Sequence, residues 1–423
     1  MKRIRVETLG CSKNTVDTEH LLAQLPPSEF EVVADGPCDV LLVNTCGFIG
    51  DAKEESVMAV LEAVRLKNAG EAGAVAVFGC LSQRYADELP AEIPEVDAWF
   101  GARDLAPVVR WLGAEPRACT SRYLTTPGKG YAYLKISEGC DRRCSYCAIP
   151  FIRGAHRSVS VEDILAEARS LVAAGVKELI LIAQDTTYYG LDLYGRRCLG
   201  ELLQRLSEVE GVEWIRIHYS YPADFPEDVL DQMARNPKVC RYLDIPLQHV
   251  ADPVLDVMHR HVDGAWTREL VRRVRERVPG VALRTTMIVG HPGEGEAEFD
   301  SLLDFVREAR FERLGAFTYS EEEGTWGARN LSDDVPFEVK QRRLDALMSL
   351  QKEISLGCNQ ARIGSEVRVL VDDCVDGTLV CRSEFESPEV DGEILVKGDA
   401  PVGSFLNVRI VAADDYDLVG EIV

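Results

Sequence analysis

The chain has 423 residues, 46% of them hydrophobic, which predicts two or three domains with buried cores. Its 47 basic and 70 acidic side chains give a net charge of −23, which argues against a broad phosphate-binding surface and favours basic partners, although solubility alone would also explain it. The 13 cysteines are an odd number in a chain without a secretory signal, so we expect reduced thiols, some of them bound to metal, rather than a disulfide framework.

No targeting or membrane segment is evident in the sequence. Its apolar runs fall short of the roughly 20 residues that span a membrane. Met1–Arg3 leads into a predicted strand instead of the apolar core of a signal peptide. We therefore expect a cytoplasmic protein.

The first predicted elements are three short buried strands with helices between them. The strands are Ile4–Thr8, Val40–Asn44 and Ala74–Phe78, and the clearest helices are Val16–Leu25 and Lys53–Lys67. Helical connections require these strands to run parallel, so their carboxyl ends should meet at one edge of a single sheet.

Each of these strands leads directly into a cysteine, namely Cys11, Cys46 and Cys80. Isolated buried cysteines are common, but three at equivalent strand ends can converge. Gly10 and Gly79, each directly before a cysteine, allow a close approach of the backbone. Because thiolates hold iron-sulfur clusters, we predict that these three cysteines bind one cluster.

The segment from Pro90 to Lys129 is predicted to be a connector. Its periodicity is weak, with Pro, Gly and scattered charge. The turn residues of Thr125–Gly130 mark its end, immediately before the central part of the chain.

Six apolar, β-branched segments follow, separated by amphipathic helical patterns. The predicted strands are Tyr131–Ser137, Glu178–Asp185, Trp214–Ser220, Tyr242–Gln248, Ala282–Gly290 and Arg313–Ser320. The predicted helices include Val161–Ala174, Gly200–Val209, Thr267–Val278 and Glu296–Arg310. Such alternation predicts an α/β fold with parallel strands covered by helices, here a (β/α)6 partial barrel.

Three further cysteines, Cys140, Cys144 and Cys147, follow the first of these strands. Ligands of such barrels collect at the carboxyl ends of the strands, and three thiolates would leave one iron of a 4Fe-4S cube free to bind a substrate or cofactor. Zinc is the alternative, but it needs a further ligand, and the nearest later candidate, His156, lies nine residues after Cys147. The remaining cysteines follow no interpretable pattern: Cys38, Cys119, Cys198, Cys240, Cys358, Cys374 and Cys381.

A helix predicted over Phe337–Leu356 should end at Gly357. Short, closely spaced strands then predict a small antiparallel β-barrel. They are Glu366–Val371, Gly377–Arg382, Glu393–Lys397, Leu406–Val411 and Asp417–Val423. From Cys358 onward, 14 acidic and 5 basic side chains give a net charge of −9 over 66 residues, and the basic residues stand singly.

The C-x3-C-x2-C spacing, with Tyr146 before the last cysteine, resembles the radical S-adenosylmethionine (SAM) superfamily. Over its whole length the chain resembles the radical SAM methylthiotransferases, which combine an N-terminal three-cysteine domain, a radical SAM barrel and a C-terminal TRAM domain usually described as RNA-binding. The segments that carry the resemblance are Thr8–Asn14, Val43–Ile49, Ile245–His249 and Phe317–Thr325. It implies domains at residues 1–115, 126–356 and 358–423. The chain departs from the family at His291, where members commonly have an aromatic residue, and at Trp326, where they have proline.

Within this family the chain is most similar to the branch that modifies a protein. The tRNA-modifying relatives usually carry Gln and Met where this chain has Ser12 and Lys13, and Gly-rich residues after the position of Gln248. The resemblance therefore implies transfer of a methylthio group to the β-carbon of an aspartate in a small-subunit ribosomal protein. A tRNA adenosine methylthiotransferase is the alternative that the TRAM domain favours and the acidic C-terminus opposes. A non-catalytic iron-sulfur carrier is the remoter alternative, since a carrier needs no full barrel.

The resemblance also implies cofactors, site residues and partners. SAM and two 4Fe-4S clusters would carry the chemistry, one cluster on each cysteine triad, because hydrogen abstraction from an unactivated carbon is beyond acid-base catalysis. No catalytic residue is expected beyond the cluster ligands. The expected SAM contacts are Tyr146, Gln184, Asp185 and Gln248. A flavodoxin or ferredoxin would supply electrons, the TRAM domain leaves room for an RNA contact, and we expect a basic ribosomal protein to dock on the acidic C-terminal domain beside the barrel mouth.

Overall fold

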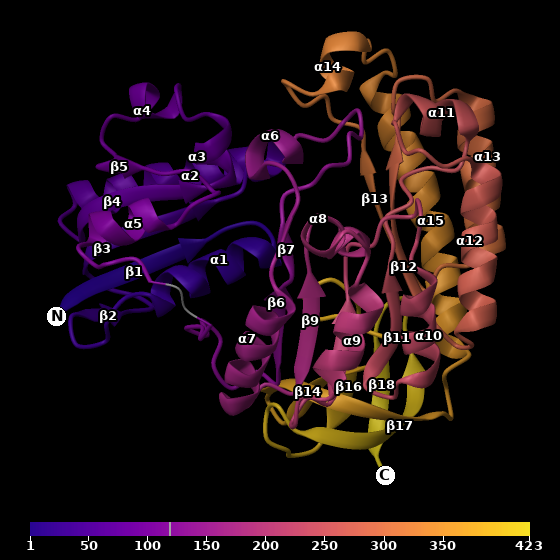
Figure 1. Cartoon of the computed structure of the whole chain (residues 1–423). Helices are drawn as coiled ribbons and strands as arrows, with labels where there is room; N and C mark the ends of the chain where they lie inside the picture. Colours follow the sequence, from indigo (N-terminus) through magenta and orange to yellow (C-terminus); the bar gives the residue numbers. More distant parts are fainter. Residues whose placement is uncertain (118–119) are drawn as a thin grey trace.

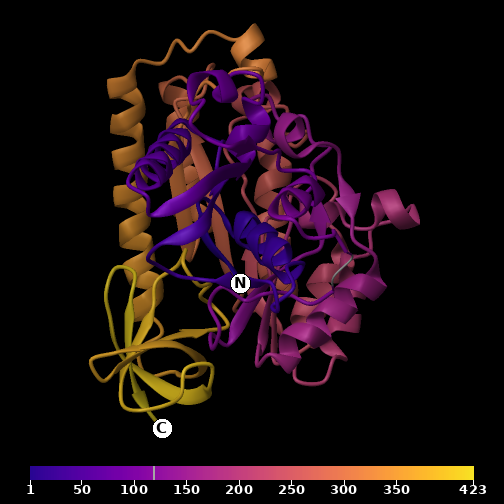
Figure 2. The same ribbon diagram turned by 90° about the vertical axis from the view of Figure 1, so that its left-hand side faces the viewer.

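The computed structural model describes residues 1–117 and 120–423 and has three parts, which follow one another along the chain (Figure 1). Cys119, one of the cysteines without a pattern, lies outside the described residues. The N-terminal part packs beside the central part, and the C-terminal part lies below the central part in Figures 1 and 2. Within the described residues, no helix combines the length and the apolar character needed to cross a membrane.

The N-terminal part is the predicted parallel sheet, with strand order β2-β1-β3-β4-β5. Its strands are β1 (Lys2–Thr8), β2 (Phe30–Val32), β3 (Cys38–Thr45), β4 (Ala72–Gly79) and β5 (Ala98–Trp99). Its helices are α1 (Ser12–Ala23), α2 (Gly50–Asn68), α3 (Cys80–Arg84), α4 (Leu89–Glu92) and α5 (Ala106–Leu112). The three strands that lead into cysteines are confirmed as parallel neighbours.

The connector predicted from Pro90 to Lys129 is wrong in its first half. There β5 adds the edge strand of the sheet and α5 packs Val108, Val109 and Leu112 into the core. The strand has two residues and the helix seven, so neither is long enough to produce a periodic pattern in the sequence. Tertiary packing therefore determines these elements.

The central part is the predicted partial barrel, a six-stranded parallel sheet with order β13-β12-β11-β10-β9-β6. Its strands are β6 (Tyr131–Lys135), β9 (Glu178–Ile182), β10 (Trp214–Ile217), β11 (Val239–Asp244), β12 (Ala282–Val289) and β13 (Arg313–Thr318). The main covering helices are α7 (Val161–Ala173), α9 (Leu199–Ser207), α10 (Glu227–Arg235), α12 (Gly264–Arg277) and α13 (Glu296–Ala309). All six predicted strands and all four predicted helices are present.

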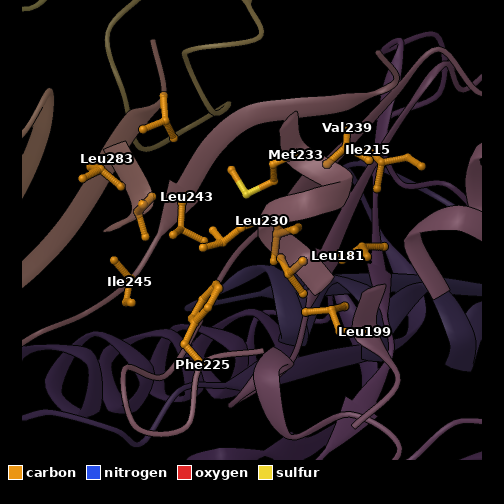
Figure 3. Close-up of a cluster of buried hydrophobic side chains, with 14 of the residues drawn as sticks. Leu181, Leu199, Ile215, Phe225, Leu230, Met233, Val239, Leu243, Ile245 and Leu283 are labelled. Carbon is orange, nitrogen blue, oxygen red and sulfur yellow. The ribbon is translucent and has the colours of Figure 1, made fainter. Parts of the chain in front are cut away.

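The core lies between this sheet and its outer helices. In Figure 3, Leu199 of α9 and Leu230 and Met233 of α10 face the strand residues Ile215 and Leu243. All five side chains are buried. Burying such side chains stabilises the fold by about 1.5–3 kcal/mol each, so this layer holds the strand ends in a fixed arrangement.

The long helix α15 (Phe337–Gln360) does not end at Gly357 as predicted. Glycine in a helix costs roughly 1 kcal/mol relative to alanine, but tertiary contacts hold this last turn. Ser355 Oγ donates to Asp415 O at 2.6 Å, and Asn359 Nδ2 donates to Asp414 O at 3.1 Å. The helix therefore continues as far as the C-terminal part.

The C-terminal part is a closed barrel with order β14-β15-β16-β18-β17. Its strands are β14 (Glu366–Val375), β15 (Thr378–Ser383), β16 (Ile394–Lys397), β17 (Phe405–Ala413) and β18 (Leu418–Ile422). The predicted small barrel is confirmed, with one difference. The pair β16 and β18 runs parallel, whereas the other neighbours are antiparallel, because closing five strands in this order brings these two together.

This barrel packs against the amino ends of the six central strands. Arg382 Nη2 donates to Glu178 Oε2 at 2.8 Å, at the first residue of β9, and Tyr133 Oη of β6 donates to Glu389 Oε2 at 2.9 Å. The body of the C-terminal domain therefore lies at the amino ends of the strands, while one of its loops reaches further along the sheet, where Ser387 Oγ lies 2.7 Å from Nε2 of His218, directly after β10. The expectation that it docks a partner beside the barrel mouth is wrong.

Candidate functional site

The carboxyl ends of the N-terminal and central sheets face one cavity. All six cysteines of the two predicted triads line it: Cys11, Cys46, Cys80, Cys140, Cys144 and Cys147. Tyr146, Gln184 and Gln248, three of the four expected SAM contacts, line it as well. The fold thus brings together residues that lie up to 237 positions apart in the sequence, from Cys11 to Gln248.

The N-terminal triad depends on glycines that bring its three loops close together. Gly10 has a φ of +88°, and a Cβ atom on it would lie 2.6 Å from Cys46 Cβ and 2.9 Å from Cys46 Sγ. Gly79 has a φ of +109°, and a Cβ there would lie 2.6 Å from Thr45 O. Any other residue at these positions would therefore push the cysteine loops apart.

The thiols of the two triads differ in burial: Cys46, Cys80 and Cys140 are buried, Cys144 and Cys147 are half-buried, and Cys11 is exposed. Burial raises the pKa of Cys80 to about 11 and that of Cys140 to about 12, and it also raises the pKa of Cys46 and Cys147. With these raised pKa values the thiols keep their protons in the absence of metal. Binding of a cluster would remove those protons, because only thiolates act as ligands. Within residues 1–117 and 120–423, no group of three or more His, Cys, Asp or Glu side chains is arranged to hold a single metal ion.

A buried arginine of the central domain contacts the N-terminal triad. Arg153 ends α6 (Ile149–Arg153), which follows the loop of Cys140, Cys144 and Cys147. Its Nε and Nη2 atoms lie 3.2 and 3.1 Å from Cys80 Sγ, and Nη1 donates to Asp17 Oδ2 at 2.6 Å. A hydrogen bond donated to a cysteine sulfur that binds a cluster changes the reduction potential of that cluster. Arg153 therefore connects the central domain with the N-terminal site.

The same network continues to the expected SAM contacts. Glu138 accepts from Lys135 Nζ at 2.7 Å, from Arg153 Nη1 at 3.3 Å and from Gln184 Nε2 at 2.6 Å. Lys135 also pairs with Asp17. Burial alone would raise the pKa of Asp17 and Glu138, but the charges of Lys135 and Arg153 outweigh burial and lower both. Gln184 is thus held in place by an ionised carboxylate.

Asp185 is arranged differently from the other expected SAM contacts. Its Oδ2 accepts from Arg142 Nε at 2.9 Å and its Oδ1 accepts from Thr187 Oγ1 at 2.6 Å. Arg142, not Asp185, lines the cavity. Asp185 therefore orients an arginine that lies between two of the cysteines in the sequence.

Several polar atoms at this cavity are buried and have no hydrogen-bond partner within the described residues: Gln184 Oε1, Ser220 Oγ, Arg142 Nη2 and Arg260 Nε. Buried polar atoms are normally paired. Their side chains surround the space beside Cys140, Cys144 and Cys147, so they suit a ligand with several donors and acceptors, such as the amino acid and ribose groups of SAM. The residues present fit both a three-thiolate cluster and SAM.

Three family models match the chain: the Radical SAM superfamily over residues 134–306, the uncharacterized protein family UPF0004 over residues 3–101, and the TRAM domain over residues 363–423. "Ribosomal protein uS12 methylthiotransferase RimO" of Porphyromonas gingivalis is 52% identical over 434 residues, covering 100% of both chains. The protein of the same name from Bacteroides fragilis is 49% identical and covers 100% of this chain and 99% of its own. The chain belongs to the RimO family.

Membership of the RimO family makes the chain a radical SAM methylthiotransferase, and the superfamily implies SAM and a 4Fe-4S cluster. Solved structures show the fold alone. The methyltransferase TsrM of Kitasatospora setae aligns with a TM-score of 0.55 at 14% identity, over 75% of this chain and 73% of its own. The radical enzyme OxsB aligns with a TM-score of 0.55 at 13% identity, over 83% of this chain and 56% of its own.

The sequence did not reveal every residue at this RimO-family cavity. Lys13, Arg142, Arg153 and Arg260 line it without having been predicted as site residues. Signals for some of them were present, because Arg142 lies inside the cysteine loop and Lys13 follows Cys11 by two residues. Arg260 had no such signal, since it lies in a loop after α11 (Asp252–Val257) and reaches the cavity only in the fold.

Tyr219 was also not predicted. It lies beyond the end of β10 and has a φ of +59°, while the predicted Gln248 lies beyond β11 with a φ of +73°. Left-handed backbone is uncommon for such residues, and it clusters at functional sites. Both residues line the cavity.

Proposed function

We propose that this protein transfers a methylthio group to the β-carbon of an aspartate in ribosomal protein uS12, the substrate that its RimO relatives are named for. The observation that carries the proposal is the shared cavity, which two separate cysteine triads line from opposite domains. A site for one cluster alone would explain SAM cleavage but would leave the second triad without a role. The domain boundaries that we propose are 1–115, 126–356 and 358–423, which the three matched regions support.

Cys140, Cys144 and Cys147 would hold the cluster that binds SAM, and Cys11, Cys46 and Cys80 would hold the second cluster. When bound, these groups supply the electron for SAM cleavage and the sulfur that is transferred, while SAM supplies the hydrogen-abstracting radical and the methyl group. The chain itself places Cys140, Cys144 and Cys147 beyond a strand of the sheet that the buried layer of Figure 3 holds. It places Cys11, Cys46 and Cys80 beyond strands of the N-terminal sheet, which has its own cores.

The pocket for SAM would use the unpaired polar atoms. Gln184 Oε1 can accept from an ammonium group, Arg142 Nη2 can donate to a carboxylate, and Ser220 Oγ can take either role. Tyr146 and Gln248 line the same wall and would contact the adenosine part. We assign Asp185 to the positioning of Arg142, because both its oxygens are already occupied.

The C-terminal domain would not take part in the chemistry, because it contacts the amino ends of the strands. Four of its five basic side chains, Arg362, Arg368, Arg382 and Arg409, pair with carboxylates. Few cations therefore remain for phosphates, which favours a basic protein over tRNA as the partner. An RNA contact through this TRAM domain remains an outcome that the experiment below would detect.

The electron donor would approach the outer side of the cysteine loop. A groove there is lined by Cys140, Cys144 and Cys147 together with the exposed aromatic residues Phe151 and Trp326. We propose that a small acidic flavodoxin or ferredoxin binds at this groove, because the exposed Arg143 and Arg329 also line it. Reversal of both arginines to Glu should slow reduction by such a donor but not by dithionite. Equal rates with the protein donor would contradict this proposal.

The function is tested by incubating anaerobically reconstituted protein with SAM, a reductant and either a uS12 peptide that contains the aspartate or bulk tRNA. Mass spectrometry should detect a methylthio group on the aspartate and none in digested tRNA. Modification of tRNA adenosine with no change in the peptide would replace this proposal by the tRNA enzyme. SAM cleavage without modification of either substrate would contradict both.

A further inference from the structure

Lys13 is a buried lysine in the cavity that the proposed mechanism does not use. It lies in the first turn of α1, two residues after Cys11, and is only 8% exposed. Its Nζ atom lies 3.1 Å from the centroid of the Tyr219 ring. The ammonium group is thus placed between the N-terminal triad and the strand ends of the central sheet.

The other cationic side chains that line the cavity have oxygen partners. Arg142 pairs with Asp185 at 2.9 Å, Arg153 pairs with Asp17 at 2.6 Å, and Arg260 Nη2 donates to Pro246 O at 2.6 Å. Lys13 Nζ has neither a hydrogen bond nor an ion pair with any residue that the structure describes. Nζ is not among the fully buried polar atoms and lies at the cavity, so an anion in the cavity can reach it, while the ring face alone satisfies only part of its charge.

The aromatic partner of Lys13 is itself held in an unusual conformation. Tyr219 has a φ of +59°, and its backbone N–H donates to Asp244 Oδ2 at 2.9 Å. A tyrosine in left-handed backbone is strained and persists only where the surrounding structure enforces it. The fold therefore holds this ring in place beneath an ammonium group that has no anion.

The carboxylates near Lys13 are already committed to other cations. Asp17 pairs with Arg153 and Lys135, and Glu138 pairs with the same two side chains. The missing anion must therefore come from a ligand. A substrate carboxylate meets this requirement, because charge-assisted hydrogen bonds to an ammonium group are strong in an enclosed site.

We propose that Lys13 binds the side-chain carboxylate of the substrate aspartate, which rests on the proposed function. In aspartate the β-carbon is bonded directly to the carboxyl carbon. An ammonium group that fixes the carboxylate therefore also fixes the hydrogen to be abstracted, between the two triads.

The test measures binding and needs no turnover. Fluorescently labelled uS12 peptides, one with the aspartate and one with Asn in its place, are titrated anaerobically against reconstituted protein without reductant. Wild type should bind the Asp peptide about 10- to 100-fold more tightly than the Asn peptide, the range expected for a hydrogen bond to a charged group. Lys13→Met should bind both peptides equally, and Lys13→Arg should keep part of the preference.

Lys129→Met is the matched control, because Lys129 also lies over a tyrosine ring, that of Tyr131, but outside the cavity. It should keep the full preference for the Asp peptide. Equal binding of the two peptides by wild type, or an unchanged preference in Lys13→Met with intact iron content, would overturn the role of Lys13. If wild type binds neither peptide and modifies neither, the proposed function itself fails.

Discussion

Both ends of the six-stranded sheet contain buried charges, but among the described residues more buried polar atoms lack partners at the carboxyl end than at the amino end, where Arg313 Nε is one such atom. At the amino end, Glu178 pairs with Arg216 and Arg382, while Glu386 pairs with Arg313 and Arg362. At the carboxyl end, Lys13 has no anion and Gln184 and Ser220 each have an unpaired buried atom within the described residues. The contrast separates a network that joins two domains from a site arranged for ligands.

Left-handed backbone occurs at both ends of the sheet. Tyr219 and Gln248, at the carboxyl end, have positive φ angles, and so do Arg310, just before β13, and Glu389, at the amino-end interface. Strain of this kind costs of order 1–3 kcal/mol at each residue. The unpaired polar atoms, and not the backbone, therefore distinguish the two ends.

The largest effects should come from the cysteines. Replacement of Cys140, Cys144 and Cys147 by Ala should abolish both SAM cleavage and methylthio transfer, and it should halve the iron content from about eight to about four atoms per chain. Replacement of Cys11, Cys46 and Cys80 should also leave about four irons but keep SAM cleavage. Iron analysis and chromatography of 5′-deoxyadenosine measure these outcomes. If the second variant retains eight irons, the N-terminal assignment is wrong.

Two buried arginines allow a direct comparison of the ends. Arg153→Met and Arg382→Met each remove one of the two cationic partners of a buried carboxylate, Asp17 or Glu178, and should destabilise the protein by about 1.5–3 kcal/mol. Only Arg153→Met should also lower the reduction potential of the N-terminal cluster, because it removes donors to Cys80 Sγ. Denaturant unfolding and redox titration followed by EPR separate the two effects. A shift of the reduction potential of the N-terminal cluster in Arg382→Met would contradict the expected difference between the two ends.

The buried ion pairs at the amino end should make the stability of the fold depend on pH. Burial alone would raise the pKa of Glu386, but Arg362 and Arg313 outweigh it and lower the pKa to about 2. Because the pKa of Glu386 is lower in the folded than in the unfolded chain, its carboxylate stabilises the fold at pH values above the ordinary pKa of a Glu. This contribution is lost as the pH falls from about 4.5 to about 2. Glu386→Gln should therefore cost about 3 kcal/mol at pH 7 and progressively less in acid.

Unfolding free energies measured at pH 7 and at pH 3.5 test this expectation. Glu366→Gln is the control, because Glu366 forms an exposed pair with Arg409 that is worth about 0–1 kcal/mol. A constant difference between Glu386→Gln and wild type over this range would show that the carboxylate is not the source of the stability.

The smallest effect is expected on the acidic surface of the C-terminal domain. Asp373 and Asp414 are exposed, whereas Asp372 pairs with the buried Arg382 and Asp415 pairs with Lys352. Reversal of Asp373 and Asp414 to Lys should change the KM for a short uS12 peptide by less than about twofold, because charges beyond about 10 Å are screened at 0.1 M salt. A large rise of KM would mean that this domain reaches the mouth.

How far the sequence could predict this protein depends on how local each feature is. The strand ends that carry Cys11, Cys46 and Cys80 were predictable, because apolar runs and helical spacing identify parallel strands without long-range information. The continuation of α15 past Gly357 was not predictable, because contacts of Ser355 and Asn359 with Asp415 and Asp414 hold its last turn. The position of the C-terminal domain depends on buried pairs such as Arg382 with Glu178, which are 204 residues apart.

The same reasoning applies to the site. Gln184 and Asp185 are adjacent in the sequence and were predicted to have one role, but the fold turns Gln184 toward the cavity and Asp185 toward Arg142 and Thr187. In the sequence, Lys13 marks a difference from the tRNA-modifying relatives two residues after Cys11, but its role is not visible there. Only the structure shows that its ammonium group has no anion, because Asp17 and Glu138 pair with other cations.

The central claim is that two cysteine triads face each other across one cavity, and EPR of the fully reduced, reconstituted protein tests it most directly. Two paramagnetic clusters in one cavity should interact and broaden or split each other's signals. This interaction should disappear when Cys11, Cys46 and Cys80 are replaced by Ala. A wild-type spectrum equal to the sum of the spectra of the two triad variants would contradict the claim, because it would mean that the clusters are far apart or that one is absent.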